Sequence, residues 1–339
     1  MRNHEVTAKK NLLDSEGHLV EPGWSRSLVQ IYERQQIKAP KWRIKEWDYY
    51  FIQSKDYVLC LTISDNGYMG LESVSLINLK TKWQHTESLI IPFPMGKLNL
   101  PSSSKRGHAH FKNKRVSLSF LNDGKKRRLL CEFKKFYEGL DFTCDILLEE
   151  IQEDSLVVAT PWDNNPKAFY YNQKINNLTA SGVANLGDEI IPFDAETSFA
   201  TLDCGRGVWT YDNTWYWGSG NGEVDGKIFG FNLGYGFGNT QAASENIIYY
   251  DGVSHKLEDI EFIHESDYMK PWEITSSDQR FEGNFKPLLD RAALTDLKVI
   301  VSDQHQVFGH FSGRVILDNG EELNLVDFFC FFEKVHNKF

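Results

Sequence analysis

The sequence predicts a mostly β protein built from many short antiparallel strands. Aromatic residues make up 14% of its 339 residues, an abundance that favours sheets over helical bundles. Dipeptides that supply the positive φ angles of tight hairpin turns recur at Asn66-Gly67, Asp123-Gly124, Asp225-Gly226, Asp251-Gly252 and Asn319-Gly320. At this length, the pattern indicates a large sandwich or two barrels in tandem.

Short apolar or alternating segments between these turns are interpreted as strands: 57–63, 115–121, 127–133, 140–148, 313–317 and 322–326. A helical pattern is rare, and we expect short helices only at 25–36 and 286–294. The first 20 residues are polar and are expected to form an arm. A small polar stretch at 176–182 marks the expected division, which gives one half over 21–180 and another over 181–339.

Composition excludes several classes of function. The net charge of −10 argues against nucleic acids and anionic membranes as main partners. No apolar run reaches the roughly 18 residues of a membrane helix, and the N-terminus lacks the apolar core of a signal peptide. The five cysteines are odd in number and form no CxxC pair, which disfavours a disulfide framework or a zinc ribbon and favours a reducing cytoplasm: Cys60, Cys131, Cys144, Cys204 and Cys330.

Polar and aromatic side chains concentrate between residues 161 and 272. In the first part of this segment, alternation places Tyr170, Asn172 and Lys174 on one strand face and Tyr171 on the other. A face that combines a ring, an amide and an amine is costly in a plain core. It is therefore either a solvated outer face or part of a binding site.

A row of indoles with one amide follows on another strand face. It consists of Asn213, Trp215 and Trp217, and Trp209 joins it if no bulge intervenes. Such a wall can stack a flat or cyclic ligand and fix its orientation, although the same side chains can equally serve barrel packing. Asp203 and Arg206, just upstream, are close enough in sequence to form a structural ion pair.

The segment 228–239 places apolar side chains on one face and glycines with Asn232 on the other, which admits a close neighbour: the tryptophan wall or a ligand. Glu245 and Asn246 then precede an apolar strand. A carboxyl beside aromatic rings can have a raised pKa and act as an acid or base, or it can lie in water at a strand end. The glycine run lacks the GxGxxG pattern before a helix, which argues against a dinucleotide site.

Histidine and serine patterns favour neither a metal centre nor a hydrolase. His108 and His110 share a strand face, but no third ligand lies nearby, so we expect no metal. His305 and His310 fall on opposite faces. A serine hydrolase is disfavoured because no GxSxG motif is present.

Several long segments resemble the bacterial family DUF2804, a domain of unknown function, over nearly the whole chain: KEWDYYFI (45–52), NPKAFYYNQKIN (165–176), DCGRGVWTYDNTWYWGSG (203–220), GFNLGYGFGNTQAASEN (230–246), DYMKPW (267–272), SDQHQVFGHFSG (302–313) and FFEKVHNKF (331–339). That family is more distantly similar to the carotenoid 1,2-hydratase, AttH and tocopherol-cyclase group. The resemblance implies two tandem lipocalin-like (calycin) antiparallel β-barrels with few short helices. The distantly similar group includes enzymes that protonate an alkene and steer the cation to water or an internal oxygen. The acidic and histidine residues of the hydratases find no match here, although Asp212 and Trp215 lie in the analogous aromatic segment.

We therefore expect an enzyme that uses acid/base chemistry, without a cofactor, on a small hydrophobic or cyclic substrate or on a carbohydrate. Glu245 and Asp212 are the candidate acids. The expected substrate-binding residues are Tyr171, Asn172, Lys174, Arg206, Trp209, Asn213, Trp215, Trp217, Asn232 and Asn246. The alternatives are a non-catalytic lipocalin-like carrier of a small ligand and an interaction module. The oligomeric state is left open.

Overall fold

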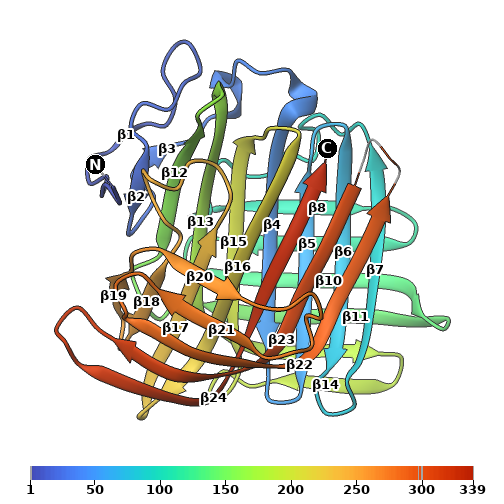
Figure 1. The fold of residues 1–339 in the computed structure, drawn as a ribbon. Coiled ribbons are helices and arrows are strands. Elements are labelled where there is room, and N and C mark those ends of the chain that lie inside the picture. Colours follow the sequence, from blue (N-terminus) through green and yellow to red (C-terminus); the bar gives the residue numbers. More distant parts are fainter. Residues whose placement is uncertain (1, 297, 299–300, 339) are drawn as a thin grey trace.

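The computed structural model describes residues 2–296, 298 and 301–338, and its regular structure is almost entirely antiparallel β (Figure 1). Two sheets contain most of the strands, and each curls into a half-barrel. This confirms the predicted fold class. No helix among the described residues has the length and apolarity of a membrane span.

The first sheet has 13 strands within the described ranges, and its main path runs β7-β6-β5-β4-β15-β13-β11-β10-β9-β8. β12 and β14 also pair with β13, and β2 pairs with β12. The strands are β2 (Gly23–Ser25), β4 (Ile44–Gln53), β5 (Tyr57–Asp65), β6 (Met69–Asn78), β7 (Trp83–Pro92), β8 (Gly107–Lys112), β9 (Val116–Asn122), β10 (Lys126–Tyr137), β11 (Leu140–Glu149), β12 (Leu156–Trp162), β13 (Asn165–Leu186), β14 (Glu189–Phe193) and β15 (Phe199–Val208).

The second sheet has nine strands in the described part of the chain, in the order β19-β18-β17-β16-β24-β23-β22-β21-β20. Its C-terminal strand β24 therefore lies in the middle of the sheet, between β16 and β23. The strands are β16 (Asp212–Val224), β17 (Lys227–Tyr235), β18 (Ile247–Tyr250), β19 (Val253–Lys256), β20 (Ile260–Ile263), β21 (Trp272–Ser276), β22 (Phe281–Asp296), β23 (Val301–Ile316) and β24 (Glu322–Lys338).

The predicted turns and strands are confirmed. Each of the five dipeptides connects two antiparallel neighbours in a sheet. Asp225 and Gly226, between β16 and β17, have φ angles of 53° and 72°, the left-handed values that a two-residue hairpin turn requires. The pairing of 313–317 with 322–326 is also present, with Val315 opposite Leu323.

The helix predictions are wrong. The segment 25–36 contains the end of β2, the short strand β3 (Gln30–Ile31) and a 3₁₀ turn, η1 (Arg34–Gln36), while 286–294 lies inside β22. A second 3₁₀ turn, η2 (Lys41–Arg43), precedes β4, and β1 (Lys10–Asn11) pairs with β3. Strand pairing, such as that between Ser25 and Val157, supplies the backbone partners and overrides a weak helical pattern.

The N-terminal segment, expected to be a polar arm, packs several apolar side chains into the protein. Val6, Leu12 and Leu13 are buried. The latter two pack with Tyr32 and Tyr171 against the first sheet. The backbone of Asn3 and His4 also bonds to Gln241 and Ala242 of the second half, so the segment contacts both halves.

The stretch 176–182 lies within β13 and is not a linker. Asn176 and Asn177 are buried, and Asn177 has a φ of 58° where a bulge interrupts the pairing of β13 with β15. The expected division at residue 180 thus falls inside a strand. Because the first sheet continues to Val208 and the second begins at Asp212, we propose that the halves divide at residues 209–211.

Each half-barrel has its own apolar interior, and a third layer of side chains lies between the two sheets. In Figure 1, the yellow-to-red strands of the second sheet cross in front of blue β4 and β5. We call the side chains enclosed there the intersheet layer. It is formed by Trp47, Tyr49, Phe51, Tyr170, Lys174 and Asp203 of the first half and by Trp215, Trp217, Asn232, Glu245, Phe331 and Glu333 of the second.

Candidate active site

An ion pair marks the middle of the intersheet layer. Lys174 on β13 and Asp203 on β15 are direct neighbours in register, and Lys174 Nζ lies 2.9 Å from Asp203 Oδ1. Their side chains are only 4% and 11% exposed. Asn172 Nδ2 donates to the same carboxylate at 2.5 Å, and the Lys174 ammonium lies 3.9 Å from the centre of the Trp217 ring. Lys174 therefore links the first sheet to the second by a cation–π contact.

Two further carboxyls, Glu245 and Glu333, lie buried around this pair. Burial raises the pKa of Glu245, and the nearby Lys174 charge and a hydrogen bond from Tyr170 oppose that shift. Burial likewise raises the pKa of Glu333 to about 7, although Lys174 again lowers it. A carboxyl with a pKa near 7 can both give and take a proton at neutral pH, as a general acid or base must.

Glu333 is held by hydrogen bonds to both of its oxygens. Trp215 Nε1 donates to Oε1 at 3.2 Å, and Gln306 Nε2 donates to Oε2 at 3.1 Å. Trp215 belongs to the neighbouring strand β16, and Gln306 to β23 on the other side of β24. The two strands that flank β24 thus fix the position of the carboxyl.

Aromatic rings enclose the layer beyond the charged groups. The Trp209 ring centre lies 5.2 Å from that of Trp47, 6.0 Å from that of Trp215 and 4.7 Å from that of Phe237, all in edge-to-face contact. Trp47 lies flat on β15 only because position 205 is glycine, since a Cβ there would stand 1.9 Å from its indole. The π faces of such rings stabilise positive charge.

A second set of hydrogen bonds positions Glu245. Trp217 Nε1 donates to Asn232 Oδ1 at 2.7 Å, and Asn232 Nδ2 donates to the carbonyl of Glu245 at 2.7 Å. Asn246 holds the same loop from the other side, since its Oδ1 accepts from Gly234 N at 2.8 Å. The predicted glycine face admits close neighbours: Glu245 lies against Gly234, and Asn177 against Gly230.

The structure therefore brings together many of the residues that the sequence indicated, and it excludes a solvated outer face for β13. Asn172, Lys174, Trp209, Trp215, Trp217, Asn232, Glu245 and Asn246 line this layer or fix its side chains. Asp203 contributes the partner of Lys174.

Other predicted residues lie elsewhere. Asp212, at the start of β16, has a side chain that is 55% exposed, and hydrogen bonds from His336 and Lys338 lower its pKa. Asn213 bonds locally to the backbone and hydroxyl of Thr210. Neither is brought to the Lys174 ion pair.

Arg206 and Tyr171 face the interior of the first half-barrel. Arg206 Nη2 lies 3.0 Å from Asp48 Oδ1, and the Tyr171 hydroxyl donates to the Gln30 carbonyl at 2.7 Å. The expected pair between Asp203 and Arg206 is wrong, because a spacing of three places the two side chains on opposite faces of β15.

Sequence reasoning missed Glu333 and its partner Gln306 as site residues. The available signal was the segment around Phe331, where a single carboxylate shares a strand face with apolar side chains. Its two hydrogen-bonding neighbours are 118 and 27 residues away, so no local motif could reveal them.

Among the residues that the structure describes, no group of three or more His, Cys, Asp or Glu side chains is arranged to hold a metal ion. His110 Nδ1 bonds to Ser119 Oγ at 2.7 Å, and His108 Nδ1 accepts the Asn122 amide at 3.1 Å. Both histidines thus have partners within the first sheet.

Three solved structures share this fold at low sequence identity. Kievitone hydratase from Nectria haematococca aligns with a TM-score of 0.55 and 12% identity, over 97% of this chain and 98% of that one. CghA with Sch210972 gives 0.54 and 10%, over 96% and 97%. A putative AttH from Nitrosomonas europaea gives 0.51 and 14%, over 90% and 96%.

No curated protein sequence matches the chain. A family model, described as a domain of unknown function (DUF2804), matches residues 3–339. The match spans both half-barrels and all residues of the intersheet layer. The chain therefore belongs to the DUF2804 family.

Proposed function

We propose that the protein is a cofactor-independent enzyme of the hydratase, lyase or cyclase type that acts on a small, hydrophobic, ring-containing substrate. One observation carries this proposal: Glu333, with a pKa of about 7, and Glu245, with a raised pKa, lie beside Lys174 in a layer walled by indoles. Proton transfer requires such a group, and the surrounding rings suit an apolar substrate better than a sugar.

The chemistry that fits this layer is protonation of a carbon–carbon double bond. The Glu333 carboxylic acid gives its proton to one alkene carbon, and the π electrons form the new C–H bond. The indole face of Trp215, beside Glu333, stabilises the cation that remains on the other carbon. Water adds to this cation, and Glu245 takes the surplus proton. Return of that proton to Glu333 restores the starting state, and the sum is alkene plus water to alcohol; dehydration is the reverse.

The fold shared with a kievitone hydratase supports a hydratase-type activity. Access to Glu333 would pass Trp215, whose ring is partly exposed while its Nε1 donates to the carboxyl. Displacing that indole would free Glu333 Oε1 to face a substrate.

The test is turnover of a panel of neutral, ring-containing alkenes and alcohols, followed by mass spectrometry in ordinary and ¹⁸O-labelled water. Hydration adds 18 Da, or 20 Da in labelled water, and cyclisation changes retention without changing mass. We expect Glu333→Gln and Glu245→Gln to lower turnover by about 10²-fold or more, the contribution of a positioned acid or base. Glu273→Gln, at an exposed position of β21, is the matched control.

Turnover that survives in both active-site variants would overturn the proposal. Release of an unaltered molecule from the purified protein, with no product from any member of the panel, would favour the carrier alternative instead.

A further inference from the structure

A separate pocket opens at one end of the first half-barrel, where the ends of four hairpins meet. Tyr57 begins β5, Asn78 ends β6, Tyr137 ends β10 and Glu189 begins β14. The pocket has a volume of about 310 Å³, near the lower end of the range for small-molecule sites. None of its lining residues belongs to the intersheet layer, so its function is independent of the proposed active site.

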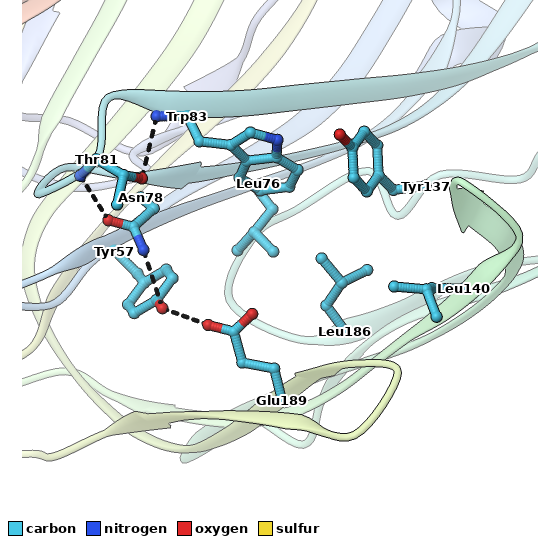
Figure 2. A pocket seen from close by; sticks show the side chains of 9 residues that line it. All are labelled: Tyr57, Leu76, Asn78, Thr81, Trp83, Tyr137, Leu140, Leu186 and Glu189. Atoms are coloured by element: carbon cyan, nitrogen blue, oxygen red, sulfur yellow. Dashed lines mark hydrogen bonds between the residues drawn. The ribbon is translucent and has the colours of Figure 1, made fainter.

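Most of the wall is apolar. Leu76, Trp83, Tyr137, Leu140 and Leu186 line the greater part of the space, and Figure 2 shows the two aromatic rings at one end with the leucines between them and Glu189. The ring centres of Trp83 and Tyr137 lie 5.0 Å apart, nearly perpendicular to each other. This packing fixes the apolar end before any ligand arrives.

His85 packs against the aromatic end of the pocket. Its ring lies 5.0 Å from that of Tyr137 and 4.9 Å from that of Phe136, and its Nε2 bonds to the Phe136 carbonyl at 2.9 Å. Phe136 belongs to the buried core of the half-barrel. The aromatic wall is thus anchored in the core rather than being a loose surface patch.

The opposite end is polar, and the Tyr57 hydroxyl and the Asn78 side chain already have hydrogen-bond partners there. The Tyr57 hydroxyl donates to Glu189 Oε1 at 2.5 Å, and Asn78 Nδ2 donates to the Tyr57 oxygen at 3.1 Å. Asn78 Oδ1 accepts the backbone amides of Lys80 and Thr81. Figure 2 shows the second oxygen of Glu189 directed into the pocket, where it can accept a hydrogen bond from a ligand.

We propose that this pocket binds a small, neutral, ring-containing molecule whose single hydroxyl donates to Glu189. The rings of such a molecule would pack against Trp83 and Tyr137, and its hydroxyl would lie at the Tyr57–Glu189 end. A carboxylate-bearing ligand is disfavoured, since it would bring a second negative charge to Glu189 and offer no donor. The pocket therefore favours a ligand whose rings fit the apolar end and whose hydroxyl donates a hydrogen bond to Glu189.

The test uses 2-naphthol as the probe and ¹⁹F NMR of protein labelled with 5-fluorotryptophan. Trp83→Phe identifies the Trp83 resonance among those of the nine tryptophans. We expect 2-naphthol to shift that resonance saturably, whereas 2-naphthoate binds about tenfold more weakly or worse. In Glu189→Leu, 2-naphthol should lose about tenfold in affinity and its advantage over 2-naphthoate should vanish. Glu196→Leu, at an exposed position in the following turn, is the matched control.

Filling the pocket gives a second, independent criterion. Leu140→Phe places a larger side chain at a position that is 45% exposed, so the fold should tolerate it, and it should abolish the Trp83 shift. An unperturbed Trp83 resonance at saturating 2-naphthol would overturn the proposal, as would equal binding in wild type, Glu189→Leu and Leu140→Phe. Turnover by the intersheet carboxyls is measured separately, so failure of either proposal leaves the other standing.

Discussion

The Lys174 ammonium lies 2.9 Å from the Asp203 carboxylate, and the same cation acts on both Glu245 and Glu333. Three buried carboxyls thus lie close enough to the Lys174 charge to be stabilised by it in their ionised form. Lys256 adds positive charge near Glu245, and Arg291 adds it near Glu333. Ionising all three would still take three carboxylates out of water, which is costly, and burial outweighs the nearby positive charges at Glu245 and Glu333. A carboxyl that stays protonated near neutral pH is the natural consequence, and this supplies the acid of the proposed mechanism.

The first prediction concerns the titration of Glu333, whose pKa is raised to about 7 by burial. Because the acid must be protonated to act, the proposed activity should fall as the pH rises through 7. In a ¹³C NMR titration of protein labelled at the glutamate carboxyl carbon, we expect one resonance that titrates near pH 7. This resonance should be absent from Glu333→Gln and present in Glu273→Gln. If this resonance persists in Glu333→Gln, another carboxyl titrates near pH 7 and the assignment to Glu333 is wrong.

The second prediction concerns Lys174 as a positioning residue. Lys174→Met leaves the buried Asp203 carboxylate without its cation, which should lower the free energy of unfolding by about 3–5 kcal/mol in urea denaturation. Because the lysine charge lowers the pKa of Glu333, its removal should also move the Glu333 titration to higher pH. Lys227→Met breaks an exposed pair with Asp251 and should leave stability nearly unchanged. Equal losses in the two variants, or an unmoved Glu333 titration, would contradict this role.

Local sequence patterns predict the strands and hairpins well, because their causes are local. Asp225-Gly226 makes its turn through the φ angles of two adjacent residues, and alternation along β13 separates Lys174 from Tyr171. The expected helix at 286–294 failed for the opposite reason, since its residues pair with residues 303–310 of β23.

Which residues meet in the candidate site depends on the pairing of distant strands, and the spacing of residues in the sequence does not reveal that pairing. Lys174 meets Asp203 because β13 and β15 pair in one register, and Glu333 joins them because the C-terminal strand enters the middle of the second sheet. Glu245 could be named as a candidate because it stands beside an apolar strand. Asp212 also lies in an aromatic segment, yet it faces solvent at the start of β16, since position on the strand decides exposure.

The third prediction concerns Glu72, a buried carboxyl on β6 whose oxygens have no hydrogen-bond partner in the described structure. Burial raises its pKa to about 9, against an ordinary value near 4.5, so the folded state holds a proton that the unfolded state releases. Stability should therefore fall as the pH rises from 4.5 to 9, by roughly 1.4 kcal/mol per pH unit for one proton. Between pH 6 and 8, the unfolding free energies of wild type and Glu72→Gln should diverge by about 2–3 kcal/mol, in favour of the variant.

Denaturation at several pH values checks this slope. Glu132→Gln, at an exposed position on β10, serves as the control and should retain the wild-type dependence. Parallel curves for wild type and Glu72→Gln would mean that Glu72 ionises in the folded protein.

The fourth prediction concerns the amide network that joins the two sheets beside the bulge of β13. Asn176 Nδ2 lies 3.0 Å from Asn221 Oδ1 and 2.9 Å from Ser219 Oγ, while the Asn177 amide donates to the same Asn221 oxygen at 2.8 Å. Asn176→Ala removes several buried hydrogen bonds at once, which should cost about 1–3 kcal/mol of unfolding free energy. Asn185→Ala removes only a half-buried bond to Thr143 on the neighbouring strand β11 of the same sheet, and it should cost less.

A double-mutant cycle between Asn176 and Asn221 separates this bond from general effects of truncation. Because both side chains share one network, the loss in Asn176→Ala/Asn221→Ala should be smaller than the sum of the single losses, with a coupling of about 0.5–3 kcal/mol. The pair lies on opposite sheets, on β13 and β16, so this coupling measures how strongly the two half-barrels stabilise each other. Strictly additive losses would mean that the bulge of β13 is held by its own sheet, and that the indole and lysine contacts of the intersheet layer join the halves without help from the amides.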